Sequence, residues 1–156
     1  MAASAQLRTN VRFSIADFGP SVQPSGMQYG SIVAFLSGTL SPETLAAEIR
    51  PEVARFRATL KKTGEGRVPA LAGPPFVVTR QGARRLLEAV AYNRLPYDTA
   101  SYLADCIVMN DDFEFADEAT RDAFFFIEDD TARFATGDDE WCPSQTETLA
   151  ALAALG

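Results

Sequence analysis

Residues 79–91 have the sequence TRQGARRLLEAVA, the plainest helical pattern in the chain. Its apolar positions recur at i, i+3, i+4, i+7 and i+8, the spacing of a helix that turns one face to a core. These positions are Ala83, Leu86, Leu87, Val90 and Ala91. Thr79 is a residue type preferred at a helix N-cap. The stretch therefore predicts a capped amphipathic helix packed against the rest of the protein.

The chain around this stretch, from about residue 42 to 155, also has helical signals. Ser41 followed by Pro42 is typical of an N-cap and first turn, and Pro51 predicts either a kinked helix or two consecutive helices. Downstream, we expect helices to begin at three further caps. These are Asp98, Asp117 and the capping-box pair Ser144 and Glu147.

The segment before residue 42 has strand signals instead. Apolar and polar residues alternate over 11–15, and an apolar run covers 31–36 between two glycines. These patterns predict a small antiparallel sheet within about residues 10–37, and Phe76–Val78 could add a short strand. The expected fold is α+β: a mainly helical single domain over 1–156 with a small N-terminal antiparallel sheet.

Charge is divided unevenly along the 156 residues, whose formal net charge is −7. Residues 95–156 hold 15 of the 21 Asp and Glu but only two of the 14 Lys and Arg. Nucleic acids and anionic membranes need a positive surface, so the composition disfavours both as partners. The acidic half is either a solvated surface that aids solubility or a surface complementary to a basic partner. The basic half is interpreted as the polar faces of packed helices, partly neutralised by the acidic half.

Several site chemistries find no support in the sequence. There is no histidine, the commonest metal ligand and general base. The acidic stretch 110–118 fails as a calcium loop, because Phe113 and Phe115 stand where oxygen ligands are needed when the loop is counted from Asp111. Cys106 falls on the expected buried face of its helix, and Cys142 has no cationic sequence neighbour. We therefore expect no enzyme activity, no cofactor and no metal.

The sequence also bears on localisation. Residues 1–12 lack an apolar segment of signal-peptide length. The longest apolar run, Ile32–Leu36, is far shorter than the roughly 20 residues needed to span a membrane. We therefore expect a cytoplasmic protein with reduced thiols.

The acidic residues concentrate in three groups that each adjoin aromatic residues. Around Asp112 to Phe115 the alternation suits a short extended segment with both rings on one side. In the run 124–126 three consecutive rings exceed the apolar stripe of a helix, so either the helix is covered on more than one side or one ring is exposed. Rings beside carboxylates resemble the composition of protein interfaces. The predicted partner-binding residues are Asp111, Asp112, Glu114, Asp117, Glu118, Phe125, Asp129, Asp130, Asp138, Asp139, Glu140 and Trp141.

The stretch from Ala100 through the acidic segment Asn110–Glu118 to Phe126 resembles the C-terminal part of small bacterial immunity proteins of contact-dependent growth inhibition systems. The shared pattern is a helix, an acidic-aromatic turn and an acidic helix, over about a fifth of the chain. The resemblance implies a cytoplasmic protein that binds and neutralises one cognate toxin domain, often a basic nuclease. Such proteins share a role more than a fold, so the resemblance implies no catalytic residue.

Two alternatives stay open beside the immunity protein. One is a small enzyme that uses carboxylates, with or without a divalent metal. The other is an interaction subunit or adaptor with no toxin involved. A toxin partner encoded by the neighbouring gene would separate the immunity protein from the adaptor, and metal-dependent stabilisation would favour the enzyme.

Overall fold

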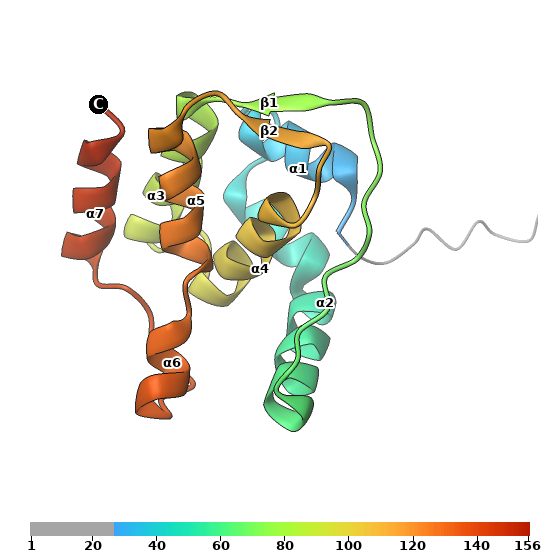
Figure 1. The fold of residues 1–156 in the computed structure, drawn as a ribbon, viewed down its shortest axis with the longest axis vertical. Coiled ribbons are helices and arrows are strands. Elements are labelled where there is room, and N and C mark those ends of the chain that lie inside the picture. Colours follow the sequence, from blue (N-terminus) through green and yellow to red (C-terminus); the bar gives the residue numbers. More distant parts are fainter. Residues whose placement is uncertain (1–26) are drawn as a thin grey trace, which may run out of the picture.

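The computed structural model describes residues 27–156, a set of helices with one small sheet (Figure 1). Residues 11–15, predicted as a strand, lie outside this range. The elements in chain order are α1 (Tyr29–Leu36), α2 (Pro42–Thr63), β1 (Phe76–Val78), α3 (Arg80–Ala91), α4 (Tyr97–Val108), β2 (Phe113–Phe115), α5 (Glu118–Glu128), α6 (Thr131–Thr136) and α7 (Gln145–Ala154).

The predicted strand over 31–36 is wrong, because this run lies in helix α1. Ile32, Phe35 and Leu36 are buried, and their i, i+3, i+4 spacing places them on one helical face. A short continuous apolar run suits a buried strand and a buried helix equally well, so periodicity could not separate the two. The predicted antiparallel sheet is therefore wrong: its second strand is a helix, and the sheet of the described residues is parallel.

The sheet that the described residues form is parallel and consists of β1 and β2, with Phe76 opposite Phe113. The strand predicted at 76–78 is confirmed. Helices α3 and α4 form the crossover between the two strands, as a parallel pair requires. In β2 the predicted alternation is confirmed, since Phe113 is buried, Glu114 is exposed and Phe115 is partly buried.

The helix predicted from residues 79–91 is α3, and it lies at the centre of the packing. Its buried residues include Ala83, Leu86 and Leu87, and Thr79 caps it by accepting the Gly82 N–H at 3.2 Å. Helix α3 packs against α1, α4, α5 and α7 (Figure 1). The hydrophobic core forms one cluster along these contacts.

Three further predicted helix starts are confirmed. Ser41 accepts the Thr44 N–H, and Asp117 accepts the Thr120 N–H. Ser144 and Glu147 form the capping box. The sequence patterns that satisfy the first free backbone N–H groups therefore locate most helix starts correctly.

Helix α4 departs from prediction, because Pro96 takes the N-cap position and Asp98 lies in the first turn. Proline fixes φ near the value that a helix start needs, so the helix begins two residues earlier. A carboxylate in the first turn still benefits from the helix dipole. The shift leaves the Asp98 side chain available for contacts with other elements.

Helix α2 continues through Pro51 as one helix of 22 residues. Pro51 itself is exposed, while Leu45, Ile49 and Val53 of the same helix are buried. None of the helices in residues 27–156 combines the length and the apolar character needed to cross a membrane.

Candidate functional site

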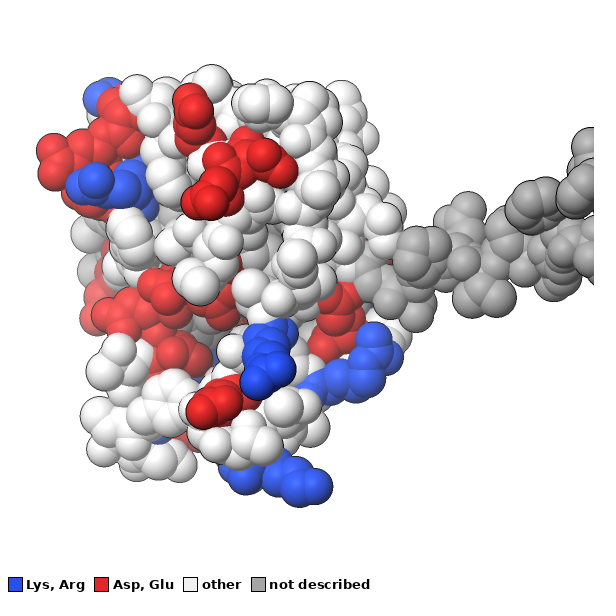
Figure 2. Space-filling view, turned by 45° about the vertical axis from the view of Figure 1, so that its right-hand side comes forward, with Lys and Arg blue, Asp and Glu red and all other residues white. Residues whose placement is uncertain are grey.

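The predicted partner-binding residues do not form one continuous surface. Asp111 and Glu114 lie at the sheet, whereas Trp141 follows α6, and Figure 1 shows the sheet and α6 at opposite ends of the molecule. Helix α5 runs between these ends. Figure 2 accordingly shows Asp and Glu in several separate groups, with Lys and Arg between them.

At the sheet end, Asp112 has a structural role. Its carboxylate accepts the Gly73 N–H at 3.3 Å, and its own N–H donates to the Asn110 side chain at 2.9 Å. The first bond joins the loop before β2 to the connector before β1, and the second lies within that loop. Asp111 and Glu114 are exposed, and within residues 27–156 neither makes a side-chain hydrogen bond or an ion pair. These two carboxylates are the free ones at this end.

The start of α5 uses Asp117 as a cap. The carboxylate accepts the N–H and the hydroxyl of Thr120 at 2.8 and 2.9 Å, and Arg80 donates to it at 2.7 Å. The Thr120 N–H and then Arg80 lower the pKa of Asp117 to about 2. The exposed Glu118 lies 3.3 Å from Arg121. Asp117 is thus committed to the fold, whereas Glu118 remains at the surface.

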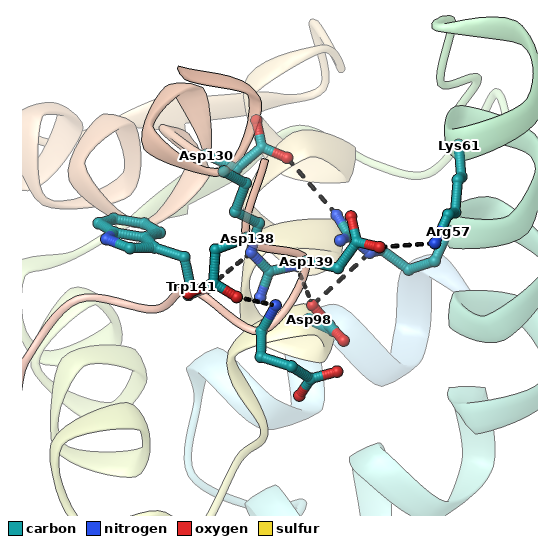
Figure 3. A network of polar contacts seen from close by, with 9 residues as sticks. Arg57, Lys61, Asp98, Asp130, Asp138, Asp139 and Trp141 are labelled. Atoms are coloured by element: carbon teal, nitrogen blue, oxygen red, sulfur yellow. Dashed lines mark hydrogen bonds and ion pairs between the residues drawn. The ribbon is translucent and has the colours of Figure 1, made fainter. Parts of the chain in front are cut away.

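Near α6 a second acidic group consists of Asp130, Asp138 and Asp139 (Figure 3), and a buried arginine contacts the loop after α6. Arg133 is only 6% exposed, donates to the Trp141 carbonyl at 2.6 Å and pairs with Asp98. Arg57 of α2 lies 3.7 Å from the same Asp98 carboxylate. The Trp141 ring meets the Tyr97 ring edge to face, with centroids 5.9 Å apart. The loop after α6 is therefore fastened to α4 and α2.

The basic helix α2 neutralises part of this acidic group. Arg57 lies 3.7 Å from Asp130, and Lys61 lies 2.6 Å from Asp139 (Figure 3). Arg80 pairs with Asp117 in the same way at the other end. These pairs confirm the expectation that the basic half partly neutralises the acidic half.

Two carboxylates of the predicted site hold local turns. Asp129 accepts the Thr131 N–H at 3.0 Å. Hydrogen bonding to the Thr131 side chain, and then to this N–H, lowers the pKa of Asp129. Asp138 accepts the Glu140 N–H at 3.0 Å. The Glu140 side chain itself is exposed.

A groove of about 480 Å³ combines apolar and acidic side chains, and it was not predicted from the sequence. It lies where the C-terminal parts of α2, α4 and α5 meet α6. Its apolar lining residues are Phe56, Leu60, Val68, Met109 and Phe134, and its charged ones are Arg67, Asp105, Glu128 and Asp130. This groove brings one predicted residue, Asp130, together with residues that the sequence did not single out.

Two of the apolar residues at the groove are strongly exposed. Met109 is 74% exposed and Phe134 is 60% exposed, the highest values among the large apolar residues of the described chain. Phe56 and Val68 are partly buried against the core, and Leu60 is partly buried. The groove therefore has an apolar floor and exposed apolar side chains at its rim, as binding grooves do.

The carboxylates of the groove are poorly solvated and poorly paired. Burial, with the nearby charges of Glu128 and Asp130, raises the pKa of Asp105 to about 7. Burial also raises the pKa of Glu128, and Asp129 and Asp130 add to the effect. Within residues 27–156 neither Asp105 nor Glu128 makes a hydrogen bond through its side chain or an ion pair. A cation brought into the groove would relieve this local excess of negative charge.

The three consecutive phenylalanines of α5 differ in exposure, and one ring is exposed, as one of the two expectations had it. Phe124 is fully buried, Phe126 is partly buried and Phe125 is 43% exposed. Phe125 lies one helical turn before Glu128 and Asp129 but does not line the groove. One exposed ring on this helix is therefore confirmed, while its contact with a partner stays a prediction.

Sequence reasoning missed Asp105, Met109 and Phe134. Asp105 and Met109 are four residues apart, so they share a face near the end of α4, and a charged residue between Ala104 and Cys106 was a usable signal. The sequence contains no such signal for Phe134, because the exposure of its side chain depends on where α6 packs. Long-range packing thus decides the groove.

Among residues 27–156, no three Cys, Asp or Glu side chains are placed to hold a metal ion. Comparisons of the chain with protein-family models, with curated proteins and with solved structures find no match.

Proposed function

We propose that this protein is an immunity protein that binds and neutralises a basic toxin domain. The single observation that carries the proposal is the groove in which the exposed Met109 and Phe134 lie beside the unpaired carboxylates of Asp105 and Glu128. Such a surface suits a partner that offers both apolar and cationic side chains. The resemblance of residues 100–126 to contact-dependent growth inhibition immunity proteins supports a toxin domain as this partner.

The free carboxylates Asp111 and Glu114 support the proposal in a second way. Neither residue lines the groove, but both are exposed and extend the negative field toward an approaching basic domain. Exposed charges of this kind raise association rates more than they lower dissociation rates. A large basic partner would thus be attracted by more of the molecule than it contacts.

The test is binding to the protein encoded by the neighbouring gene. We expect the two proteins to co-purify with a dissociation constant of about 1 nM or lower, the class of specific inhibitors. Replacing Asp111 and Glu114 by Lys should slow association at low salt and have little effect at high salt. Asp112 is kept in this experiment because it holds the neighbouring loop. An absence of binding would remove the toxin from the proposal.

A carboxylate-based enzyme is the second candidate, and Asp105 is the observation that favours it. Its pKa of about 7 would let it exchange a proton near neutral pH, as a general acid or base must. A rise in melting temperature with calcium, magnesium or manganese would support a metal-dependent form of this activity. An unchanged melting temperature with all three, together with toxin binding, would favour the inhibitor.

A further inference from the structure

We infer that the groove between α2, α4, α5 and α6 binds a basic amphipathic segment of the partner, with apolar side chains against Met109 and Phe134 and a lysine or arginine beside Asp105 and Glu128. This inference rests on the proposed function, because it names the part of the partner that the acidic surface takes. The occupant of the groove is a polypeptide segment with both apolar and cationic side chains, and neither a free cation nor a purely apolar ligand.

Exposed apolar side chains at the groove favour an occupant that covers them. Met109 and Phe134 lose their exposed surface only if something covers them, and each Å² of apolar surface removed from water contributes about 25 cal/mol. Met109 follows the end of α4 and Phe134 belongs to α6, and both line the same groove, so one occupant can cover both. The volume of about 480 Å³ suits several side chains rather than a single ion. An inorganic cation would leave both side chains exposed.

The charges that line the groove are unbalanced toward the negative. Asp105, Glu128 and Asp130 face one lining cation, Arg67, and Asp130 is shared with Arg57 at 3.7 Å. Burial without a partner makes a carboxylate costly, and a cation placed beside it recovers part of that cost. A lysine or arginine reaches such a site with an apolar stem and a charged end. Nucleic acid, being an anion, would add to the repulsion.

The rim of the groove is held in place before any partner binds. Arg133 precedes Phe134 in α6, and its bonds to Asp98 and the Trp141 carbonyl fix that helix against α4. A preformed rim lowers the ordering cost of binding. An amphipathic helix laid in an apolar groove is a recurring way of recognising a peptide with alternating apolar and charged faces.

A synthetic peptide tests the inference with the whole chain. The probe is a labelled amphipathic helix of about four turns with leucines on one face and lysines on the other. Its counterpart carries glutamates in place of the lysines. Fluorescence anisotropy measures binding to the wild-type protein and to Phe134→Ser and Glu128→Gln. The matched controls are Tyr92→Ser, an aromatic residue exposed to 58%, and Asp122→Asn, an exposed carboxylate on the same helix as Glu128.

We expect the lysine peptide to bind the wild type and each groove variant to weaken binding about tenfold, with both controls within twofold of the wild type. Circular dichroism confirms that each variant is folded. Equal binding of the glutamate peptide, or affinities unchanged in the groove variants, would overturn the inference. If the toxin binds and the groove variants bind it equally well, the groove inference fails while the inhibitor stands. If the lysine peptide needs the groove but no toxin binds, the groove stands and the toxin proposal fails.

Discussion

The guanidinium of Arg133 lies over the Tyr97 ring, with 4.8 Å between its central carbon and the ring centroid. The same guanidinium, although almost fully buried, donates hydrogen bonds to Asp98 and to the Trp141 carbonyl. Buried cations are tolerated when they are paired and hydrogen-bonded in this way. The contact joins α6 to α4 and positions the rim residue Phe134.

Replacing Arg133 with Met should lower the free energy of unfolding by about 2 kcal/mol, because the change removes the hydrogen bonds of a buried guanidinium and leaves the Trp141 carbonyl without its donor. Urea denaturation measures the loss. The control is Arg121→Met, where the side chain is 47% exposed and the change should stay within about 0.5 kcal/mol. Equal losses for the two variants would contradict a structural role for Arg133.

Replacing Asp105 with Asn should stabilise the protein at high pH. The pKa of Asp105 in the folded protein, about 7, lies above its ordinary value near 4. Between these pH values the folded chain holds a proton that the unfolded chain releases, so the stability of the wild type falls as pH rises through this window. The Asp105→Asn variant does not lose stability in this way, because asparagine does not ionise. We expect it to be more stable by on the order of 1–3 kcal/mol at pH 8 and equal to the wild type near pH 4.

Thermal or urea unfolding at both pH values tests this prediction. Asp122→Asn serves as the control, because Asp122 is exposed and lies outside the groove. A stability difference for Asp105→Asn that is the same at pH 4 and pH 8 would show that the carboxylate is ionised in an ordinary environment. The same variant should weaken binding of the lysine peptide, so stability and binding would change in opposite directions.

Asp117 should stabilise the protein only above its folded pKa. Its pKa of about 2 lies below the ordinary value near 4, so its contribution is present above pH 4 and is lost as pH falls toward 2. Asp117→Ala should lower the melting temperature at pH 7, and this difference should shrink near pH 2. Asp117→Asn keeps a cap acceptor and should lose less than Asp117→Ala at pH 7. A melting temperature unchanged by either variant would contradict the capping role.

The two cysteines should differ sharply in reactivity. Cys106 is buried, and that burial, with Glu52 nearby, raises the pKa of its thiol to about 12. Cys142 is exposed. Because the thiolate is the reactive form, the folded protein should expose one reactive thiol to a disulfide reagent and the denatured chain two. Cys142→Ser should abolish the rapid reaction, and a persisting rapid reaction in that variant would contradict the burial of Cys106.

Local signals in the sequence located most helices of the described chain because they act over a few residues. Caps at Ser41, Thr79, Asp117 and Ser144 and the apolar spacing of α3 all reflect short-range geometry. The strand prediction for residues 31–36 was wrong because a short apolar run carries no periodicity that favours strand over helix. The parallel pairing of β1 with β2 joins segments that are far apart in the sequence, and nothing local specifies it.

The candidate site was less predictable than the fold, because it depends on which charged side chains lie close enough to pair. The sequence shows that Asp130 and Asp139 are acidic, but only the packing of α2 shows that Arg57 and Lys61 neutralise them. Conversely, Asp105 lies within an apolar helix, so the sequence did not single it out. Its position at a groove depends on how α5 and α6 pack beside α4. Charge counts along the chain therefore predicted an acidic half but not where its unpaired carboxylates lie.

The adjacent rings of Phe124 and Phe125 give a test of the packing of α5. Phe124 is fully buried and its ring lies 5.3 Å from that of Phe115, so Phe124→Ala should cost about 3–5 kcal/mol of unfolding free energy. Phe125 is 43% exposed, so Phe125→Ala should cost well under about 1 kcal/mol. Chemical denaturation of both variants under one condition measures the contrast. Similar costs for the two would mean that α5 is rotated relative to the core, and the groove carboxylate Glu128 would then face elsewhere.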